Sequence, residues 1–332
     1  MNLINTKMES LYTYLDDSAA YLEKAQNLTY LEGLAEAGEN LFREEVCQNV
    51  TMEQKNWLLD KLDSLNLEEL SNEDIRKAFQ LAVLKGMKGA VQPHHSMTPD
   101  TVCLFLSYLV NKVIGKREES IHLLDMAAGS GNLVHALMNQ VTAPLSVTAF
   151  EVDETLVKLA FVSANLQKHE LQLFHKDSIE PISYNPVDVV VTDLPVGYYP
   201  KDEIAAEYAL RAKEGHSFIH HLMIEQAINK TKDGGFLFFL VPNFIFESDQ
   251  AKQLHEFVKG ETNILALLQL PKTMFQSEQF GKSIFVLQKK GENTIQPKQA
   301  LLAELPSFSK KEALSDMMKQ INKWFKDELR IE

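Results

Sequence analysis

Apolar residues recur at three- and four-residue intervals through the first quarter of the chain. In residues 8–85 the recurring positions include Leu11, Leu15 and Leu22, a spacing typical of the buried face of an amphipathic helix. A later helix is predicted to begin at Ser71, where Asp74 can complete a capping box, and to end at Gly86. No cluster of potentially catalytic side chains occurs in this part of the sequence. We therefore predict a helical N-terminal domain, residues 1–90, that packs against the rest of the chain or recruits a protein partner.

After residue 121 the pattern changes to short apolar runs that alternate with amphipathic stretches. Seven strands are predicted, at residues 123–126, 147–152, 171–176, 187–192, 236–241, 264–270 and 284–288. Helices fill the gaps as far as the sixth strand, but residues 271–283 are too few for a crossover helix, so the seventh strand is expected to be antiparallel. Residues 91–332 thus form an α/β domain with a seven-stranded, mainly parallel, Rossmann-like sheet and an antiparallel last strand. A short apolar run at 300–305 and an amphipathic helix around 314–325 follow it.

Composition limits the classes of function. The chain of 332 residues has 33 Lys and Arg against 46 Asp and Glu, a net charge of −13, which is the reverse of a protein that binds nucleic acid unaided. The N-terminus lacks a signal-peptide pattern and no apolar run is long enough to span a bilayer, so we expect a cytoplasmic protein without membrane association. Cys47 and Cys103 have no metal-binding spacing, and the adjacent pairs His94-His95 and His220-His221 cannot face one centre from a helix, so no metal is predicted.

The first strand leads into a glycine turn. It ends at Asp125, and Ala127, Ala128, Gly129, Ser130 and Gly131 then connect it to a helix that begins at Asn132. Glycines at such a turn let a ligand approach the backbone and the helix N-terminus closely. The dinucleotide-binding pattern requires a third glycine, where this chain has Val134. That departure, and the acid upstream of the turn, favour S-adenosylmethionine over NAD.

Carboxylates also follow the second and third strands. Glu151, followed by Val152, lies about twenty residues past the turn, where an acid accepts hydrogen bonds from ribose hydroxyls. Asp153 is better suited to capping the next helix. Asp177, followed by Ser178, can accept from an adenine amino group, although a turn-capping role is the alternative. Because ligands bind at the carboxyl ends of parallel strands, these acids predict one cofactor site.

The fourth strand ends in Asp193-Leu194-Pro195-Val196, and here the chain resembles a known family. Over residues 90–290 it is similar to the class I S-adenosylmethionine-dependent methyltransferases, and within them to the N6-adenine DNA methyltransferases, including the methylating subunit of type I restriction systems. Residues 97–99, 125–133, 234–246 and 270–275 also match their motifs. The family has Asn/Asp/Ser-Pro-Pro-aromatic after this strand, so the first and third positions match and the second and fourth depart. The resemblance implies S-adenosylmethionine as cofactor, with Thr98 holding its methionine carboxylate.

The departures matter for the chemistry. An exocyclic aromatic amine is a poor nucleophile, because its lone pair is delocalised into the ring. Hydrogen bonds from its two N–H groups to an Asp193 oxygen and to the Leu194 carbonyl would aim that lone pair at the methyl group, and both acceptors survive the substitutions. The missing aromatic would have stacked on an extruded base, which is worth about 1–3 kcal/mol. Tyr198 or Tyr199 is a candidate replacement, with an ordinary loop residue as the alternative.

Only about forty residues follow Lys290, so we expect no separate target-recognition domain. Together with the acidic balance, this predicts weak nucleic-acid binding without a partner protein. The leading interpretation is an N-methyltransferase of the adenine-modifying type. Two alternatives stay open: a cofactor-binding interaction protein that has lost catalysis, and a methyltransferase for an amine on a protein or small molecule.

Overall fold

The computed structural model describes residues 3–88, 97–183, 185–275 and 277–331. The chain divides into two compact units. The first unit contains Met1–Ser107, Ala128–Gln140 and Glu151–Lys176, and the second contains Tyr108–Ala127, Val141–Phe150 and Asp177–Glu332. The domain boundary at residue 90 stays a prediction.

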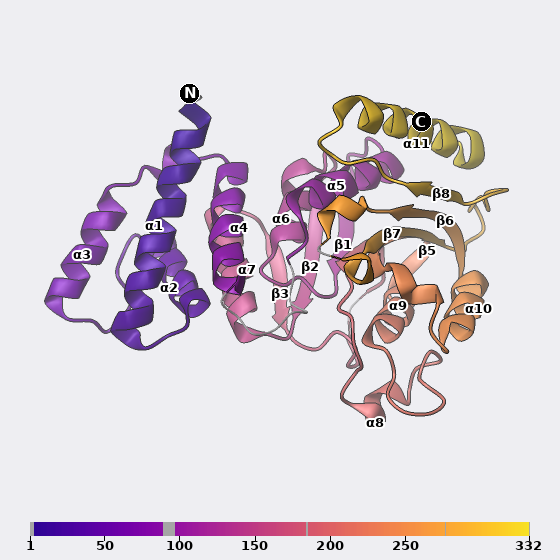
Figure 1. Cartoon of the computed structure of the whole chain (residues 1–332), viewed down its shortest axis with the longest axis horizontal. Coiled ribbons are helices and arrows are strands. Elements are labelled where there is room, and N and C mark those ends of the chain that lie inside the picture. The colour runs from indigo at the N-terminus through magenta and orange to yellow at the C-terminus, as the bar shows by residue number, and fades with distance from the viewer. Residues whose placement is uncertain (1–2, 89–96, 184, 276, 332) are drawn as a thin grey trace. The chain divides into compact units, whose positions relative to one another are not determined.

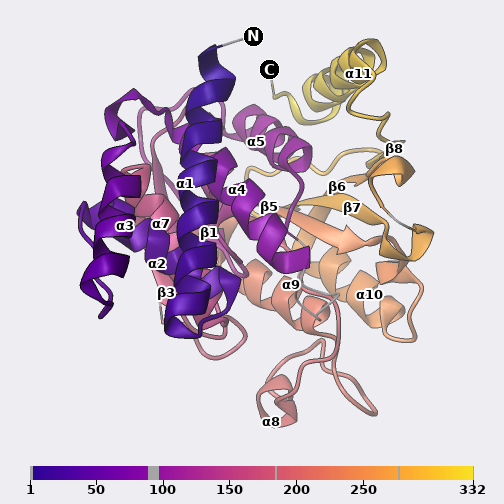
Figure 2. The same ribbon diagram turned by 60° about the vertical axis from the view of Figure 1, so that its left-hand side comes forward.

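The first unit begins with a group of helices (Figure 2). They are α1 (Leu3–Gln26), α2 (Tyr30–Arg43), α3 (Met52–Asp63), the short 3-10 turn η1 (Leu67–Glu69) and α4 (Asn72–Lys88). The predicted capping box is present, since the Ser71 backbone N–H donates to Asp74 Oδ2 over 3.0 Å and the Asp74 backbone N–H donates to Ser71 Oγ over 3.2 Å. However, α4 continues through Gly86. A Cβ atom there would lie 2.5 Å from Leu31 Cδ2, so this glycine permits close helix packing and is not a C-cap.

The N-terminal helices share one core with a helix of the α/β part. Leu11, Leu34 and Phe79 belong to the same buried cluster as Leu159 and Val162 of α7 (Glu154–Leu166). The first unit also contains α6 (Asn132–Gln140) and β3 (Leu171–His175). The periodic leucines of α1 therefore pack against α2 and α4, and these two helices in turn pack against α7.

An eight-stranded sheet confirms the predicted fold class (Figure 1). Besides β3 its strands are β1 (Ile121–Asp125), β2 (Leu145–Glu151), β4 (Val187–Asp193), β5 (Thr231–Pro242), β6 (Thr262–Gln269), β7 (Lys282–Lys289) and β8 (Leu301–Glu304). The order is β3-β2-β1-β4-β5-β7-β6-β8. Pairing is parallel from β2 through β1 and β4 to β5, and β7 is antiparallel to both β5 and β6. The expected antiparallel return is thus confirmed.

The sheet has one strand more than the seven that the sequence predicts. The additional strand, β8, pairs in parallel with residues 266–269 of β6. It lies within the apolar run 300–305, which alone did not indicate a strand. With four residues and alternating partial burial, β8 is too short for its pattern to identify it.

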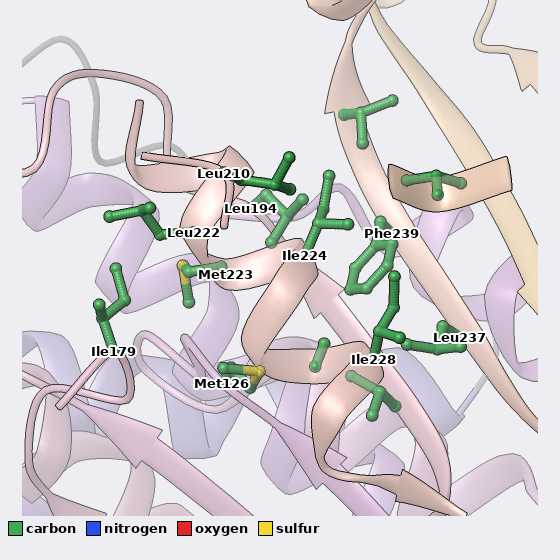
Figure 3. Packing of buried hydrophobic residues seen from close by; sticks show 14 of the residues in the cluster. Met126, Ile179, Leu194, Leu210, Leu222, Met223, Ile224, Ile228, Leu237 and Phe239 are labelled. Atoms are coloured by element: carbon green, nitrogen blue, oxygen red, sulfur yellow. The ribbon is translucent and has the colours of Figure 1, made fainter. Parts of the chain in front are cut away.

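A large apolar core fixes the carboxyl ends of the central strands of the second unit. In Figure 3, Ile224 and Ile228 of α9 (Ile219–Asn229) lie beside Phe239 and Leu237 of β5. Phe239 of β5 and Met126, directly after β1, belong to the same cluster. The remaining helical segments are α5 (Asp100–Ile114), which runs from the first unit into the second, α8 (Asp202–Ala205), η2 (Asn243–Phe246), α10 (Ala251–Glu261), η3 (Lys272–Met274), η4 (Glu278–Phe280) and α11 (Lys311–Leu329). Among the described residues, no helix is both long and apolar enough to cross a membrane.

Candidate active site

The glycine turn between β1 and α6 has a left-handed backbone. Gly129 has a φ of 56° and Gly131 a φ of 85°, values that residues other than glycine adopt only at an energetic cost. The Gly131 N–H donates to the Ala128 carbonyl over 2.9 Å and closes the turn. A Cβ on Gly131 would lie 2.5 Å from His135 Cε1, whereas no described atom lies within 4 Å of the Cβ position at Gly129. The first glycine therefore leaves its backbone accessible, and the second allows α6 to begin.

Glu151 and the glycine turn are brought together, as predicted. Glu151 Oε2 accepts from the Gly129 N–H over 2.8 Å, and Oε1 accepts from the backbone N–H groups of Val152 and Asp153 over 2.8 and 2.9 Å. A carboxylate has about four acceptor positions, so one remains, on Oε2. This remaining acceptor position suits a ligand hydroxyl, which would donate to it. Asp153 accepts from the Leu156 N–H over 2.9 Å and caps α7, which confirms the capping role expected of it. The ribose contact of Glu151 stays a prediction.

Thr98 lies beside the start of α6 in the first unit. Its carbonyl accepts from Asn132 Nδ2 over 2.9 Å, and its side chain is almost fully buried. Asn132 Oδ1 in turn accepts from Arg76 of α4 over 2.8 Å. Sequence reasoning missed Arg76. Nothing in the helical pattern of residues 8–85 distinguishes it from a cation at the surface.

In the second unit, the segments after β1 and β3 are held together. Asp125 is buried and its Oδ1 accepts from the Ala127 N–H over 3.1 Å. The buried Ser178 hydroxyl donates to the Met126 carbonyl over 2.8 Å. Asp177 already has several donors: its Oδ2 accepts from the Tyr199 hydroxyl over 2.7 Å and from Lys201 Nζ over 3.2 Å. The acid expected to face adenine therefore also anchors the loop that follows β4.

That anchoring distinguishes the two tyrosines that the sequence left as alternatives. Tyr199 is 2% exposed, and burial, reinforced by the hydrogen bond to Asp177, raises the pKa of its hydroxyl. Tyr198 is 64% exposed and stacks on Phe218, with ring centroids 5.0 Å apart and planes 15° apart. Backbone hydrogen bonds from the N–H groups of Tyr199 and Ile219 fasten the loop on both sides of Tyr198. Of the two tyrosines, Tyr198 is therefore the one whose ring is exposed.

Asp193 ends β4, where the sequence places it, and has a cationic neighbour that the sequence did not reveal. Lys282 Nζ, at the start of β7, forms an ion pair with Asp193 Oδ1, and their side chains are only 20% and 13% exposed. Leu194 is buried in the apolar core formed by residues of α9 and β5 (Figure 3), which explains an apolar residue at the second position of the motif. Pro195 follows it in the chain. The antiparallel return of β7 brings Lys282 here, because it runs back from the edge where β4 and β5 end.

The paired histidines are part of the core of α9. His220 and His221 are buried with ring planes 88° apart, and burial lowers the pKa of His220 to about 3 and that of His221 to about 4. His94 and His95 lie outside the described residues. Within the described ranges, no group of three or more His, Cys, Asp or Glu side chains is arranged to hold a metal ion.

Comparison with known proteins assigns this arrangement to a family. Residues 93–328 match the N-6 DNA Methylase family, and residues 9–87 match the YtxK N-terminal helical domain. The YtxK protein of Bacillus subtilis (strain 168) is 49% identical over 322 residues, which cover 96% of this chain and 98% of that protein. The crystal structure of a candidate class I S-adenosylmethionine-dependent methyltransferase from Listeria monocytogenes is 40% identical, with a TM-score of 0.91 over 97% of this chain and 99% of that one.

A more distant structure has the same fold. It is a modification subunit assigned to a type I restriction enzyme of Vibrio vulnificus YJ016, with a TM-score of 0.66 and 15% identity over 84% of this chain and 63% of that one. The family match covers most of the chain, which therefore belongs to the N-6 DNA methylase family of S-adenosylmethionine-dependent methyltransferases. Its cofactor is S-adenosylmethionine.

Proposed function

We propose that the protein transfers a methyl group to an exocyclic amine of the adenine type, with Asp193 and the Leu194 carbonyl as acceptors for its two N–H groups. The observation that carries the proposal is the loop of residues 193–198. It begins with a carboxylate at the end of β4 and presents an exposed, stacked Tyr198 ring five residues later. The carboxylate suits an amine and the ring suits the face of a base.

The residues that hold the cofactor are likewise proposals. In the first unit they are Thr98, Ala128, Gly129, Gly131, Asn132, Glu151 and Val152, and in the second Asp125, Ala127, Asp177 and Ser178, with Asp193 beside the methyl group only, where it contributes little to affinity. The remaining acceptor position of Glu151 suits a ribose hydroxyl, and the accessible backbone at Gly129 suits a ligand in close contact. When bound, S-adenosylmethionine supplies a methyl group activated by the positive sulfur. The contribution of the chain is then to orient the amine and to exclude unproductive approaches.

Within the motif, each residue has a distinct task. The Lys282 ammonium holds Asp193 in one orientation, so the acid cannot rotate away from the amine. Burial of Leu194 fixes the backbone that carries the second acceptor, and Pro195 limits the freedom of the same segment. Tyr198 supplies the stacking surface in place of the aromatic that Val196 replaces.

A second candidate is a protein that binds the cofactor without transferring its methyl group. The Lys282 ion pair favours it, because this cation already engages one oxygen of Asp193. A methyltransferase for an amine on a protein or small molecule would use the same carboxylate and would not need the Tyr198 ring.

Methyl transfer from radiolabelled S-adenosylmethionine to unmethylated single-stranded and duplex DNA tests these proposals. Asp193→Ala should abolish turnover and leave cofactor affinity nearly unchanged. Tyr198→Ala should raise KM for DNA roughly 5- to 150-fold, the equivalent of one stacked base at about 1–3 kcal/mol, and Tyr198→Phe should restore it. Wild-type turnover in Asp193→Ala would refute the mechanism. Cofactor binding without transfer to DNA, protein extract or small amines would favour the second candidate.

A further inference from the structure

A buried cation links the N-terminal helices to the segment that follows the glycine turn. Arg76 of α4 is 1% exposed. Its Nε and Nη2 donate to the two oxygens of Glu73 over 2.6 and 2.8 Å, and Nη2 also pairs with Asp100 at the start of α5. Its Nη1 donates to Asn132 Oδ1 over 2.8 Å, at the first residue of α6. One guanidinium thus holds three segments in a fixed relation.

The Asn132 side chain connects Arg76 to Thr98 through the two ends of its amide. Its side-chain oxygen accepts from Arg76, so its Nδ2 must point the other way, where it donates to the Thr98 carbonyl over 2.9 Å. A reversed amide would place two donors against each other. Asn132 directly follows Gly131, whose left-handed backbone shapes the turn. The orientation of one amide therefore relates the turn, Thr98 and α4.

Stability alone does not explain a charge at this position. Burial lowers the pKa of Arg76, but hydrogen bonds to Glu73 and Asp100 more than compensate, so the net pKa is raised and the side chain is charged. Replacing such buried ionic groups with well-packed apolar residues is often neutral or stabilising in proteins, and the best-supported reason to retain them is specificity of geometry. Only a forked donor such as arginine can satisfy Glu73, Asp100 and Asn132 together.

We propose that Arg76 is a positioning residue for cofactor binding. It acts through Asn132 to hold the glycine turn and Thr98 in the arrangement that receives S-adenosylmethionine. The N-terminal helical segment is then a functional part of the cofactor site and not only a packing module. This inference rests on the cofactor role proposed above for Thr98 and the turn.

The chain offers a matched control at the other end of α6. Asn139 Nδ2 donates to Glu73 Oε2 over 3.1 Å and to Gln167 Oε1 over 3.0 Å. It also joins α4 to α6, but nearly two helical turns after Asn132. A variant at Asn139 therefore loosens the same pair of helices and leaves all hydrogen bonds of the Asn132 amide in place, although Asn139 and Arg76 Nε share Glu73 Oε2 as acceptor.

Titration calorimetry of S-adenosylmethionine with the full chain, alongside melting curves, tests the proposal. Arg76→Lys keeps the charge but loses the fork, so we expect its affinity to fall at least tenfold. Asn139→Ala should lower Tm and leave Kd within about twofold of wild type. In an Asn132→Ala background, Arg76→Lys should weaken binding much less than it does alone, because the intermediary is gone.

The outcomes separate this inference from the proposed function. Unchanged affinity in Arg76→Lys, or an equal loss with and without Asn132, would overturn the positioning role while the cofactor assignment stands. If Asn139→Ala lost as much affinity for S-adenosylmethionine as Arg76→Lys, the effect would be a general loosening of α4 and α6 and not positioning by Arg76. Absence of binding by the wild-type protein would overturn both. If Arg76→Lys does not melt cooperatively, Arg76→Gln replaces it in the same comparison.

Discussion

The backbone fixes the carboxylate of Glu151, the side chain proposed above to accept from a ribose hydroxyl. Three N–H groups, from Gly129, Val152 and Asp153, fix both of its oxygens before any ligand arrives. A side chain held in this way loses little further entropy on binding. The single remaining acceptor position on Oε2 also restricts the ligand to one more hydrogen bond, unless a backbone bond is given up.

We predict that Glu151→Gln weakens S-adenosylmethionine binding roughly 10- to 150-fold, equivalent to a charge-assisted hydrogen bond of about 1.5–3 kcal/mol. The amide nitrogen cannot accept, so at least one of the three backbone donors loses its partner. Titration calorimetry measures the change. Asp153→Asn is the control, because asparagine caps a helix as well as aspartate does and should leave Kd unchanged. Wild-type affinity in Glu151→Gln would contradict the proposed ribose contact.

Sequence reasoning could find residues whose position along a strand defines their role, and it missed those defined by distant contacts. Glu151 and Asp193 follow apolar runs, so their places at strand ends could be predicted. Lys282 is 89 residues from Asp193, and Arg76 is 56 residues from Asn132. Their importance arises from packing between elements, for which a single sequence carries no periodic signal.

Strands of this protein could be predicted with more certainty than helix ends. A parallel strand buried on both faces is a continuous apolar run, as in the consecutive valines of β4. By contrast, Gly86 has the sequence signature of a helix end, but close packing against Leu31 requires it inside α4. The short strand β8 exists because it pairs with β6, and that pairing joins distant parts of the sequence.

Helix α9 leads to a prediction about pH. The unfolded chain protonates His220 and His221 near pH 6.5, whereas burial keeps both neutral in the folded state down to about pH 3–4. Above pH 6.5 both states bind no proton, so stability is unaffected. Below pH 6.5 the unfolded state binds protons that the folded state does not bind. Each imidazole should therefore lower the free energy of unfolding by about 2 kcal/mol at pH 5.

Urea unfolding at pH 7.5 and pH 5.0 measures this loss. In His221→Gln the difference in unfolding free energy between the two pH values should shrink by about 2 kcal/mol, because one titrating group is removed. Ile228→Val, also in the core of α9, removes no titrating group and is the control, whose difference should match wild type. An unchanged difference in His221→Gln would show that His221 does not stay neutral in the folded protein.

The whole chain combines a helical segment that matches one domain family with a methyltransferase domain that matches another. In the first unit the N-terminal helices share a core with α7, and Arg76 of α4 donates to Asn132 of α6. If Arg76 positions the cofactor site as proposed, a change in α4 alters cofactor binding. The net charge of −13 bears on the affinity of the chain for DNA.

We predict that the isolated protein binds naked duplex DNA weakly at physiological salt. With 33 basic and 46 acidic residues, few phosphates can be neutralised and little counterion release is available to drive binding. A fluorescence anisotropy titration with a labelled duplex near 150 mM salt should give a Kd well above micromolar. Repeating it at 50 mM salt shows how many phosphates are contacted, since the slope of log K against log salt is about −0.9 per contact in duplex DNA. Submicromolar binding near 150 mM salt would contradict the prediction, because the chain would then need no basic partner to reach a DNA substrate.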